Sequence, residues 1–446
     1  MKKMRFASIA TLCMVPAMFW SNESSAIPSW ARKYQVSCYM CHSGFAARNA
    51  TGEAFMNNGF RLPGGGDGAF TKQENVKLGV EDWKKSIDAP NTGSIPQFNP
   101  LSIVVNGNVI SYSNQVTNSK TGASSGKAFT INAPNGLNLF YGASLGDNFT
   151  IFGQIGGLGT AVVETDETVT TIETNASHTL RAVYQIQPGL NFAIGNAFQG
   201  GTYNGYVSQA TNVLPAPQTY AELTYTQGET GGYTITAGTS TGAKYNTVGY
   251  SAAINKLNDL TYVRAKVKLI GAGLLSGTGG EFGNNYNGVD NQLSIGGGLT
   301  HASTINNATT IKTSPRGFSA NYLGESLVYG GDIQAAYQNV IFGFAVSKDK
   351  DLKLTNYQTA IGYFVIPSVY AKITYADIAN AANIATPNLI HKPTIAPSVA
   401  WWPAPNISMT GTYTYNQRKY YDTAANLAAG ANTTANTFNL AVQAAF

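Results

Sequence analysis

The chain has 446 residues, of which 43% are hydrophobic and only 11% are charged. Soluble domains carry about 25% charged residues, and the 25 Tyr and 20 Phe exclude a disordered chain. Beyond the N-terminus no run of about 18 apolar residues occurs, which excludes a transmembrane helix. A chain that is rich in aromatic residues and Gly but poor in charge is typical of a transmembrane β-barrel.

The first 26 residues have the three parts of a signal peptide. Three basic residues lie among the first five, an apolar stretch follows over 7–20, and small residues occupy 24–26. The apolar stretch is too short for a membrane anchor. The segment 1–26 therefore predicts export. Without it the net charge falls from +5 to +3, which excludes a nucleic-acid partner.

Two of the three cysteines lie in the pentad Cys38-Tyr39-Met40-Cys41-His42. This is the attachment pattern of haem c: two thiols at this spacing reach the two vinyl groups of one haem, and His42 becomes an axial ligand of its iron. A redox Cys-x-x-Cys would require a thioredoxin-like βαβ unit, and a zinc site would require two further ligands. The pentad predicts one covalent haem c.

Residues 27–75 are predicted to form a small cytochrome segment that is partly helical. Its aromatic residues are candidate walls of a haem pocket: Trp30, Tyr34, Phe45, Phe55 and Phe60. Met56 is the candidate distal ligand, with a five-coordinate or otherwise ligated haem as the alternative. The segment is short for a cytochrome domain, so we expect the rest of the protein to supply the missing wall. Residues 76–97 are the predicted linker.

Residues 98–446 alternate between apolar and polar side chains with the period of a β-strand. The stretches 137–145, 180–186, 219–226, 260–269, 369–376 and 406–416 are examples. Short turns alternate with long polar connections, one of them near 111–136, which is typical of an outer-membrane barrel. The final residues, 438–446, carry an apolar face that ends on Phe446. The predicted fold is all-β: a transmembrane antiparallel barrel of about 16 or 18 strands, with the haem segment as a plug.

Several charged residues are predicted to face the lumen of this barrel. They are Arg181, Arg264, Lys266, Lys268 and Lys372, with Glu222 opposing them. Lumenal charges in porins tune ion selectivity. Pairing with haem propionates is the alternative.

Residues 26–34 read Ala-Ile-Pro-Ser-Trp-Ala-Arg-Lys-Tyr, directly before the haem motif, and residues 52–60 read Gly-Glu-Ala-Phe-Met-Asn-Asn-Gly-Phe. Over 26–62 the chain resembles the fused monohaem cytochrome–porin family of iron-oxidising bacteria. That family combines a Pro-aromatic-Ala-Arg segment, the haem motif and a Gly-Arg-x-Phe-Lys-Leu-x-Gly-Tyr-like stretch with a porin of about 16 strands. Two departures, at 43–51 and 55–57, alter the distal haem environment.

The resemblance implies electron transfer across the outer membrane through a haem inside or at the mouth of the barrel. Extracellular Fe(II) or another metal would be the donor, and a soluble periplasmic cytochrome or another electron acceptor would receive the electron. Two alternatives stay open: a passive diffusion porin with a structural or sensory haem, and outward transfer to extracellular metal. The sequence does not separate an electron-transfer protein from an iron(II) oxidoreductase, and it assigns no catalytic residue. The expected partners also include outer-membrane lipid.

Overall fold

The computed structural model of the chain describes residues 28–44, 47–63, 76–77, 94–95, 99–116, 124–132, 136–145, 148–156, 177–196, 219–240, 260–277, 289–302, 312–313, 319–320, 326–350, 354–377, 389–391, 393–404, 406–420 and 433–446. The predicted signal peptide, most of the predicted linker and most residues of the predicted long connections lie outside the described residues. Within the described residues, no helix is long and apolar enough to cross a membrane.

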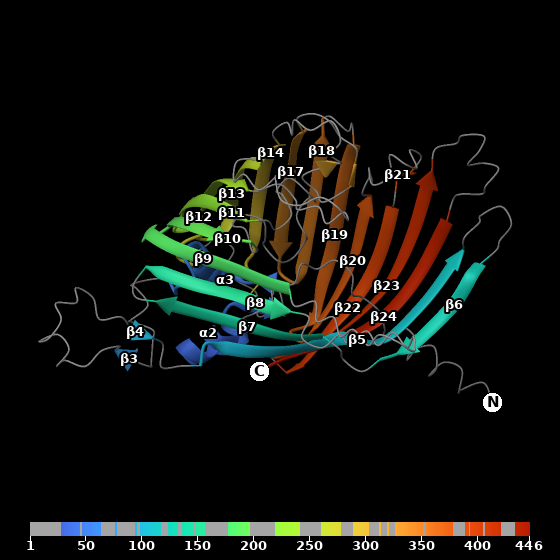
Figure 1. Cartoon of the computed structure of the whole chain (residues 1–446), viewed down its shortest axis with the longest axis horizontal. Helices are drawn as coiled ribbons and strands as arrows, with labels where there is room; N and C mark the ends of the chain where they lie inside the picture. Colours follow the sequence, from blue (N-terminus) through green and yellow to red (C-terminus); the bar gives the residue numbers. More distant parts are fainter. Residues whose placement is uncertain are drawn as a thin grey trace, which may run out of the picture.

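Helices occur only near the N-terminus of the described chain, and strands make up most of the rest (Figure 1). The elements are α2 (Pro28–Tyr34), η1 (Cys38–Met40), β1 (His42–Gly44), β2 (Ala47–Arg48), α3 (Ala50–Asn57), β3 (Val76–Lys77), β4 (Ser94–Ile95), β5 (Leu101–Val116), β6 (Ser124–Ile131), β7 (Gly136–Leu145), β8 (Phe149–Gly156), β9 (Ser177–Gln187), β10 (Leu190–Gly195), β11 (Tyr220–Gln227), β12 (Thr230–Ser240), β13 (Leu260–Ala272), β14 (Gln292–Ala302), β15 (Lys312–Thr313), β16 (Ser319–Ala320), β17 (Ser326–Tyr337), β18 (Val340–Asp349), β19 (Leu354–Ile366), β20 (Val369–Asp377), β21 (Leu389–His391), β22 (Pro393–Ala404), β23 (Ile407–Tyr420) and β24 (Thr433–Ala445).

Eighteen of the described strand segments form one closed antiparallel sheet. Two barrel strands are interrupted. β7 and β6 pair with successive halves of β5, and β22 and β21 pair with successive parts of β23. Counting each interrupted strand once gives a closed barrel of 16 strands within the described residues. The predicted barrel is confirmed at the lower of the two expected strand numbers. The expected long connection at 111–136 instead contains β6.

The barrel closes between β24 and β5, the last and first strands of the sheet. At this seam the N–H of Ile103 donates to the carbonyl oxygen of Phe446 at 3.0 Å, and the N–H of Phe446 donates back at 2.8 Å. At the same end of the barrel only residues 338–339 join β17 to β18, and residues 367–368 join β19 to β20. We call this end the short-turn rim. In outer-membrane barrels the short turns lie on the periplasmic side.

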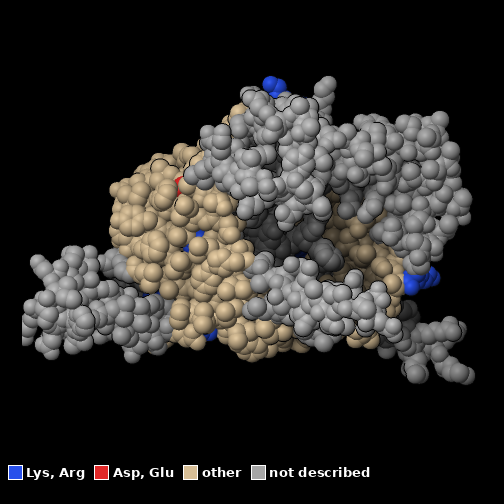
Figure 2. All heavy atoms as spheres, viewed as in Figure 1, with Lys and Arg blue, Asp and Glu red and all other residues tan. Residues whose placement is uncertain are grey.

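The two faces of the wall differ sharply in polarity. On β13 the outward Val267 and Leu269 are 43% and 56% exposed, whereas the inward Arg264 and Lys268 are buried. Large exposed hydrophobic residues recur on the outward face of most other barrel strands. Figure 2 shows few Lys, Arg, Asp or Glu side chains on the described part of the wall that faces the viewer. A closed barrel with such a face can span a bilayer, because its backbone groups pair with one another.

Buried ion pairs lie along the inward face of this wall. Arg181 of β9 pairs with Glu222 of β11 at 2.7 Å, and Arg264 of β13 pairs with Asp332 of β17 at 2.5 Å. Each pair reaches across an intervening strand. A Cβ at Gly296 of β14 would press on both Arg264 and Asp332. The missing side chain therefore leaves room for the long partners to lie flat against the wall.

Candidate functional site

The predicted haem motif belongs to a short segment that packs inside the barrel at the short-turn rim. We call residues 28–62 the N-terminal segment. Figure 1 shows its helices α2 and α3, in blue, behind strands β7 to β10. The segment touches the inward side chains of this wall, and its contacts are described below.

Asn49 organises the part of the segment that carries the cysteines. Its side-chain oxygen caps α3 by accepting the Gly52 N–H at 2.9 Å. Its own N–H donates to the Cys41 carbonyl oxygen at 3.0 Å, and its side-chain amide donates to the Met40 carbonyl oxygen at 3.1 Å. One residue thus starts the helix and ties it to the turn of the haem motif.

Gly52 allows α3 to lie directly against this turn. A Cβ at that position would overlap the carbonyl oxygen of Cys41. In a helix interior Gly is less stable than Ala by roughly 1 kcal/mol. Close packing, rather than helix stability, explains the Gly at this position.

Cys38, Cys41 and His42 follow one another through η1 and into β1. The N–H of Cys41 donates to the Cys38 carbonyl oxygen at 3.2 Å, and both thiols are free and half-buried. Burial raises the pKa of Cys38, and burial together with the neighbouring Cys38 raises the pKa of Cys41 to about 12. Reactive Cys-x-x-Cys pairs have a lowered thiol pKa. These surroundings therefore keep both thiols protonated, unlike those of a reactive redox dithiol.

Four of the five predicted pocket aromatics pack into one cluster with the barrel wall. Trp30 stacks on Phe60 with ring centres 5.0 Å apart and meets the edge of Phe55 at 5.3 Å. Phe60 in turn lies 4.4 Å from Phe152 of β8. Tyr34 meets Phe55 on the other side of the cluster. The fifth aromatic, Phe45, lies outside the described residues.

Polar contacts fix the rest of the segment to the wall. From donor to acceptor they are Arg61 to Thr150 Oγ1 (3.0 Å) and to the Phe149 carbonyl oxygen (3.1 Å), Asn57 to the Leu274 carbonyl oxygen (2.9 Å), Asn58 to the Leu275 carbonyl oxygen (2.8 Å), Gln185 to the Asn58 carbonyl oxygen (2.9 Å) and Asn191 to the Asn57 carbonyl oxygen (2.7 Å). These bonds connect the end of α3 and the residues after it to three strands and one turn. The C-terminal part of the segment is thus anchored to the wall.

Glu53 supplies the strongest electrostatic contact between the segment and the wall. Its carboxylate forms ion pairs with Lys266 and, at 3.1 Å, with Lys268 of β13, and Lys268 also pairs with Asp290 at 2.6 Å. Burial alone would raise the pKa of Glu53, but the two ammonium groups hold it below its usual range. The carboxylate therefore stays ionised inside the barrel.

The N-terminal segment also contains two buried basic side chains of its own. Lys33 is 2% exposed and Arg61 is 3% exposed. Burial, reinforced by the positive charge of Arg61, lowers the pKa of Lys33 to about 7. The interior of the segment thus disfavours an additional positive charge.

The structure places the remaining predicted residues as follows. Met56 lies half-buried in α3, and Lys372 lies on the inward face of β20 opposite Gly362. The predicted inward positions of Arg181, Glu222, Arg264, Lys266 and Lys268 agree with their burial and pairing. Within the described ranges, no cluster of three or more His, Cys, Asp or Glu residues could hold a metal ion.

Sequence reasoning missed the residues that dock the segment. Glu53 and Asn49 lie in the stretches that resemble the cytochrome–porin family, but neither was predicted to contact the barrel. Asp290 and Asp332 were not predicted to have a role either. One signal was present: Glu53 is an acid in a segment otherwise rich in aromatic and small residues. A buried acid needs a cationic partner, and lysines had already been predicted on the inward face of β13.

Comparison with known proteins identifies no family. No family model matches the chain, and no curated protein is similar to it. Among solved structures it resembles an anion-selective porin from Comamonas acidovorans (12% identity, 78% of this chain and 98% of that chain, TM-score 0.43). It also resembles the outer membrane channel DcaP of Acinetobacter baumannii (11%, 78% and 96%, 0.43) and OprB of Pseudomonas putida (9%, 78% and 93%, 0.42). At these values the barrel fold rests on the strand pairing of this chain itself.

Proposed function

We propose that the protein is an electron-transfer protein of the bacterial outer membrane, with one covalent haem c held by the N-terminal segment inside a porin-like barrel. The observation that supports this most is that a segment carrying Cys38-x-x-Cys41-His42 is bound to the inward wall by aromatic packing, hydrogen bonds and the Glu53 ion pairs. The outward apolar face supports the membrane location. The predicted signal peptide supports export.

The residues present fit a haem c. Two free, half-buried thiols at the attachment spacing are followed directly by an imidazole, and an aromatic cluster occupies the same segment. Cys38 and Cys41 would hold the group through thioethers, and His42 would be an axial ligand. Met56 stays the candidate distal ligand. When bound, haem c supplies a one-electron carrier. The aromatic cluster and α3 fix the position of its attachment turn.

The proposed direction of transfer is inward. Fe(II) outside the cell would deliver electrons, and a soluble periplasmic cytochrome or another acceptor would collect them at the short-turn rim. The resemblance to fused cytochrome–porins over 26–62 supports this direction and the iron donor. The segment packs at the rim that faces the periplasm in such barrels, which is where a soluble acceptor would meet it.

A passive diffusion porin is the second candidate, and the barrel itself favours it. The inward wall is lined with polar and charged side chains, among them Thr224, Thr236, Asn356 and Gln358. Such a lining suits an aqueous channel. In that case the N-terminal segment would be a structural or sensory element, and solute flux would not depend on Cys38 or Cys41.

The experiment that tests haem attachment uses the full chain and a Cys38→Ser/Cys41→Ser variant. The wild type should keep a haem stain after denaturation in SDS, because thioethers are covalent, and the variant should lose it. Ser37→Ala, next to the motif, is the control and should stain normally. An unstained wild type with the mass of the bare polypeptide would contradict haem attachment.

A second measurement tests the transfer itself. In liposomes with a soluble cytochrome inside, external Fe(II) should reduce that cytochrome through the wild type. His42→Ala should lower this rate at least tenfold while the barrel still shifts its gel mobility on heating. Equal rates in both proteins, together with solute permeability, would favour the passive porin.

A further inference from the structure

One cavity lies on the outside of the barrel, not in its lumen. It is a groove of about 850 Å³ that crosses the outward face of β19, β20, β22, β23, β24, β5 and β6. Most of the side chains that line this groove are apolar and stand on the outward face of their strands. The Ser398 hydroxyl lies on the opposite, inward face of β22 and donates to the Lys372 carbonyl oxygen at 3.4 Å.

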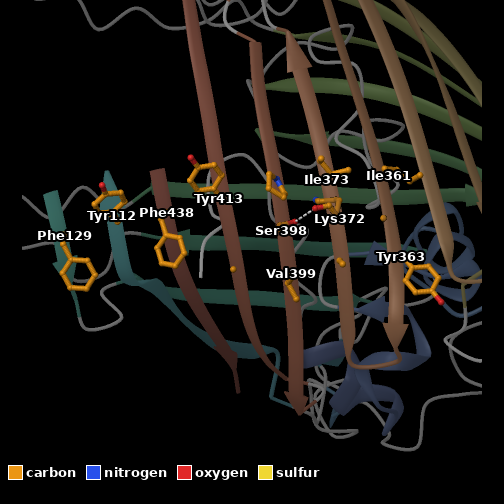
Figure 3. A pocket seen from close by; sticks show the side chains of 14 residues that line it. Tyr112, Phe129, Ile361, Tyr363, Lys372, Ile373, Ser398, Val399, Tyr413 and Phe438 are labelled. Carbon is orange, nitrogen blue, oxygen red and sulfur yellow. Dashed lines mark hydrogen bonds between the residues drawn. The ribbon is translucent and has the colours of Figure 1, made fainter. Parts of the chain in front are cut away.

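The sequence explains why the outer wall is hollowed here. Small residues form the floor: the strand registers align Ala371, Val399 and Gly411 on neighbouring strands. Aromatic rings flank the floor, with Tyr363 on one side and Tyr413, Phe438, Tyr112 and Phe129 on the other (Figure 3). A row of small side chains between large ones thus hollows the outer surface at this place.

The groove begins near the short-turn rim. Tyr363 lies three residues before the end of β19 and Ala371 two residues after the start of β20, which places both within about 10 Å of the turn. Trp401 of β22 pairs with Val369, the first residue of β20, so it also lies near this turn. Its side chain points outward and is 47% exposed. Tryptophan at the end of a membrane strand marks the interface between headgroups and hydrocarbon. The groove thus runs from one interface toward the middle of the bilayer.

We propose that this groove is a binding site for the acyl chains of one phospholipid from the periplasmic leaflet. The groove is continuous with the outward apolar face, so hydrocarbon is the medium that meets it, and its volume lies within the range of specific ligand sites. A symmetric dimer through this groove fits poorly, because a twofold interface brings the same patch together from both copies, and two concave patches leave an empty space between them. The inference rests on the membrane placement proposed above and is independent of the haem.

Val399→Trp tests the proposal by filling the floor of the groove. Val267→Trp is the matched control, because Val267 is also an outward valine and the two are 41% and 43% exposed. The full-length proteins are reconstituted in vesicles of phosphatidylethanolamine and phosphatidylglycerol, extracted in mild detergent and weighed by native mass spectrometry. We expect one retained phospholipid on the wild type and on Val267→Trp, and at least a fivefold lower occupancy on Val399→Trp.

Three results would overturn the site. They are a wild type that retains no phospholipid, an unchanged occupancy in a Val399→Trp protein that still shifts its mobility on heating, and a lipid-free dimer in place of the lipid-bound chain. The first and third are read from the wild type alone, so they do not depend on the folding of the variant. Loss of haem in the Cys38→Ser/Cys41→Ser protein should leave lipid retention unchanged, which distinguishes failure of this proposal from failure of the haem proposal.

Discussion

Two stretches of the same strand use buried charge in different ways. Arg264 pairs with Asp332, so its charge is balanced inside the wall. Lys266 and Lys268, two and four residues further along the same inward face, pair with Glu53 of the N-terminal segment. The first pair needs only the barrel, whereas the second exists only while the segment is docked. The N-terminal segment is therefore part of the charge balance of the wall.

Removing the N-terminal segment should have the largest effect, which is an increase in conductance through the barrel. In a protein that lacks residues 28–62 the wall keeps its own ion pairs, so we expect a barrel that still shifts its gel mobility on heating. The lumen loses the aromatic and helical residues that lie against β5, β7 to β10 and β13. Conductance in planar bilayers should rise several-fold. An unchanged conductance would show that the segment does not obstruct the lumen.

Glu53→Gln and Glu222→Gln should each weaken a different part of the molecule. Removing one partner of a buried ion pair costs about 3–5 kcal/mol. Glu53→Gln should therefore weaken docking and raise the rate of trypsin cleavage within the segment on the order of a hundredfold, with little change in the temperature of barrel unfolding. Glu222→Gln leaves Arg181 unbalanced in the wall and should lower that temperature without exposing the segment.

A change in the same property in both variants would show that the two ion pairs do not have separate roles. A double-mutant cycle of Glu53→Gln with Lys266→Met tests whether Glu53 and Lys266 interact directly, because a direct pair gives a coupling energy that separate sites do not.

Gly52→Ala should have a smaller effect, which is confined to the segment. The new Cβ overlaps the Cys41 carbonyl oxygen, so we expect a loss of about 1–3 kcal/mol, larger than the helix gain of roughly 1 kcal/mol. Trypsin cleavage of the segment should increase, and the fraction of chains with covalent haem should fall. Thr51→Ala on the same helix is the control. Equal cleavage of both variants would argue against close packing at Gly52.

The smallest predicted effect is a pH dependence of docking. In the docked segment burial and Arg61 lower the pKa of Lys33 to about 7, against 10.5 in the free chain. Between these values the free segment binds more protons, so docking strengthens as the pH rises, by at most about 1.4 kcal/mol per pH unit. Below pH 7 both states are protonated and this contribution is constant.

Trypsin cleavage of the wild type should therefore fall between pH 7 and pH 9 once it is corrected for the pH dependence of trypsin. Lys33→Met should abolish the difference. The same slope in both proteins would show that another group titrates.

The barrel could be predicted from the sequence because its period of two is local and repeats in every strand. The stretch 260–269 already separated Arg264, Lys266 and Lys268 from Val267 and Leu269, and the structure places these groups on opposite faces. β6 was missed, because the polar stretch near Lys127 resembles a loop until its pairing with β5 is known.

The docking contacts could not be predicted, because they join residues that lie far apart in the chain. Glu53 and Lys268 are 215 positions apart, and Asn57 and Asn191 are 134 apart. No local pattern indicates which inward strand receives α3. The haem motif was visible because its chemistry lies within five consecutive residues.

The seam of the barrel has a consequence for the order of assembly. Trp30 and Phe60 pack on a cluster that includes Val104 of β5 and Ala445 of β24, the two strands that close the sheet. Before those strands pair, the surface that receives the segment is incomplete. Docking of the first residues of the described chain therefore follows the pairing of its last strand, and protection of the segment from proteases should serve as a kinetic marker for closure of the barrel.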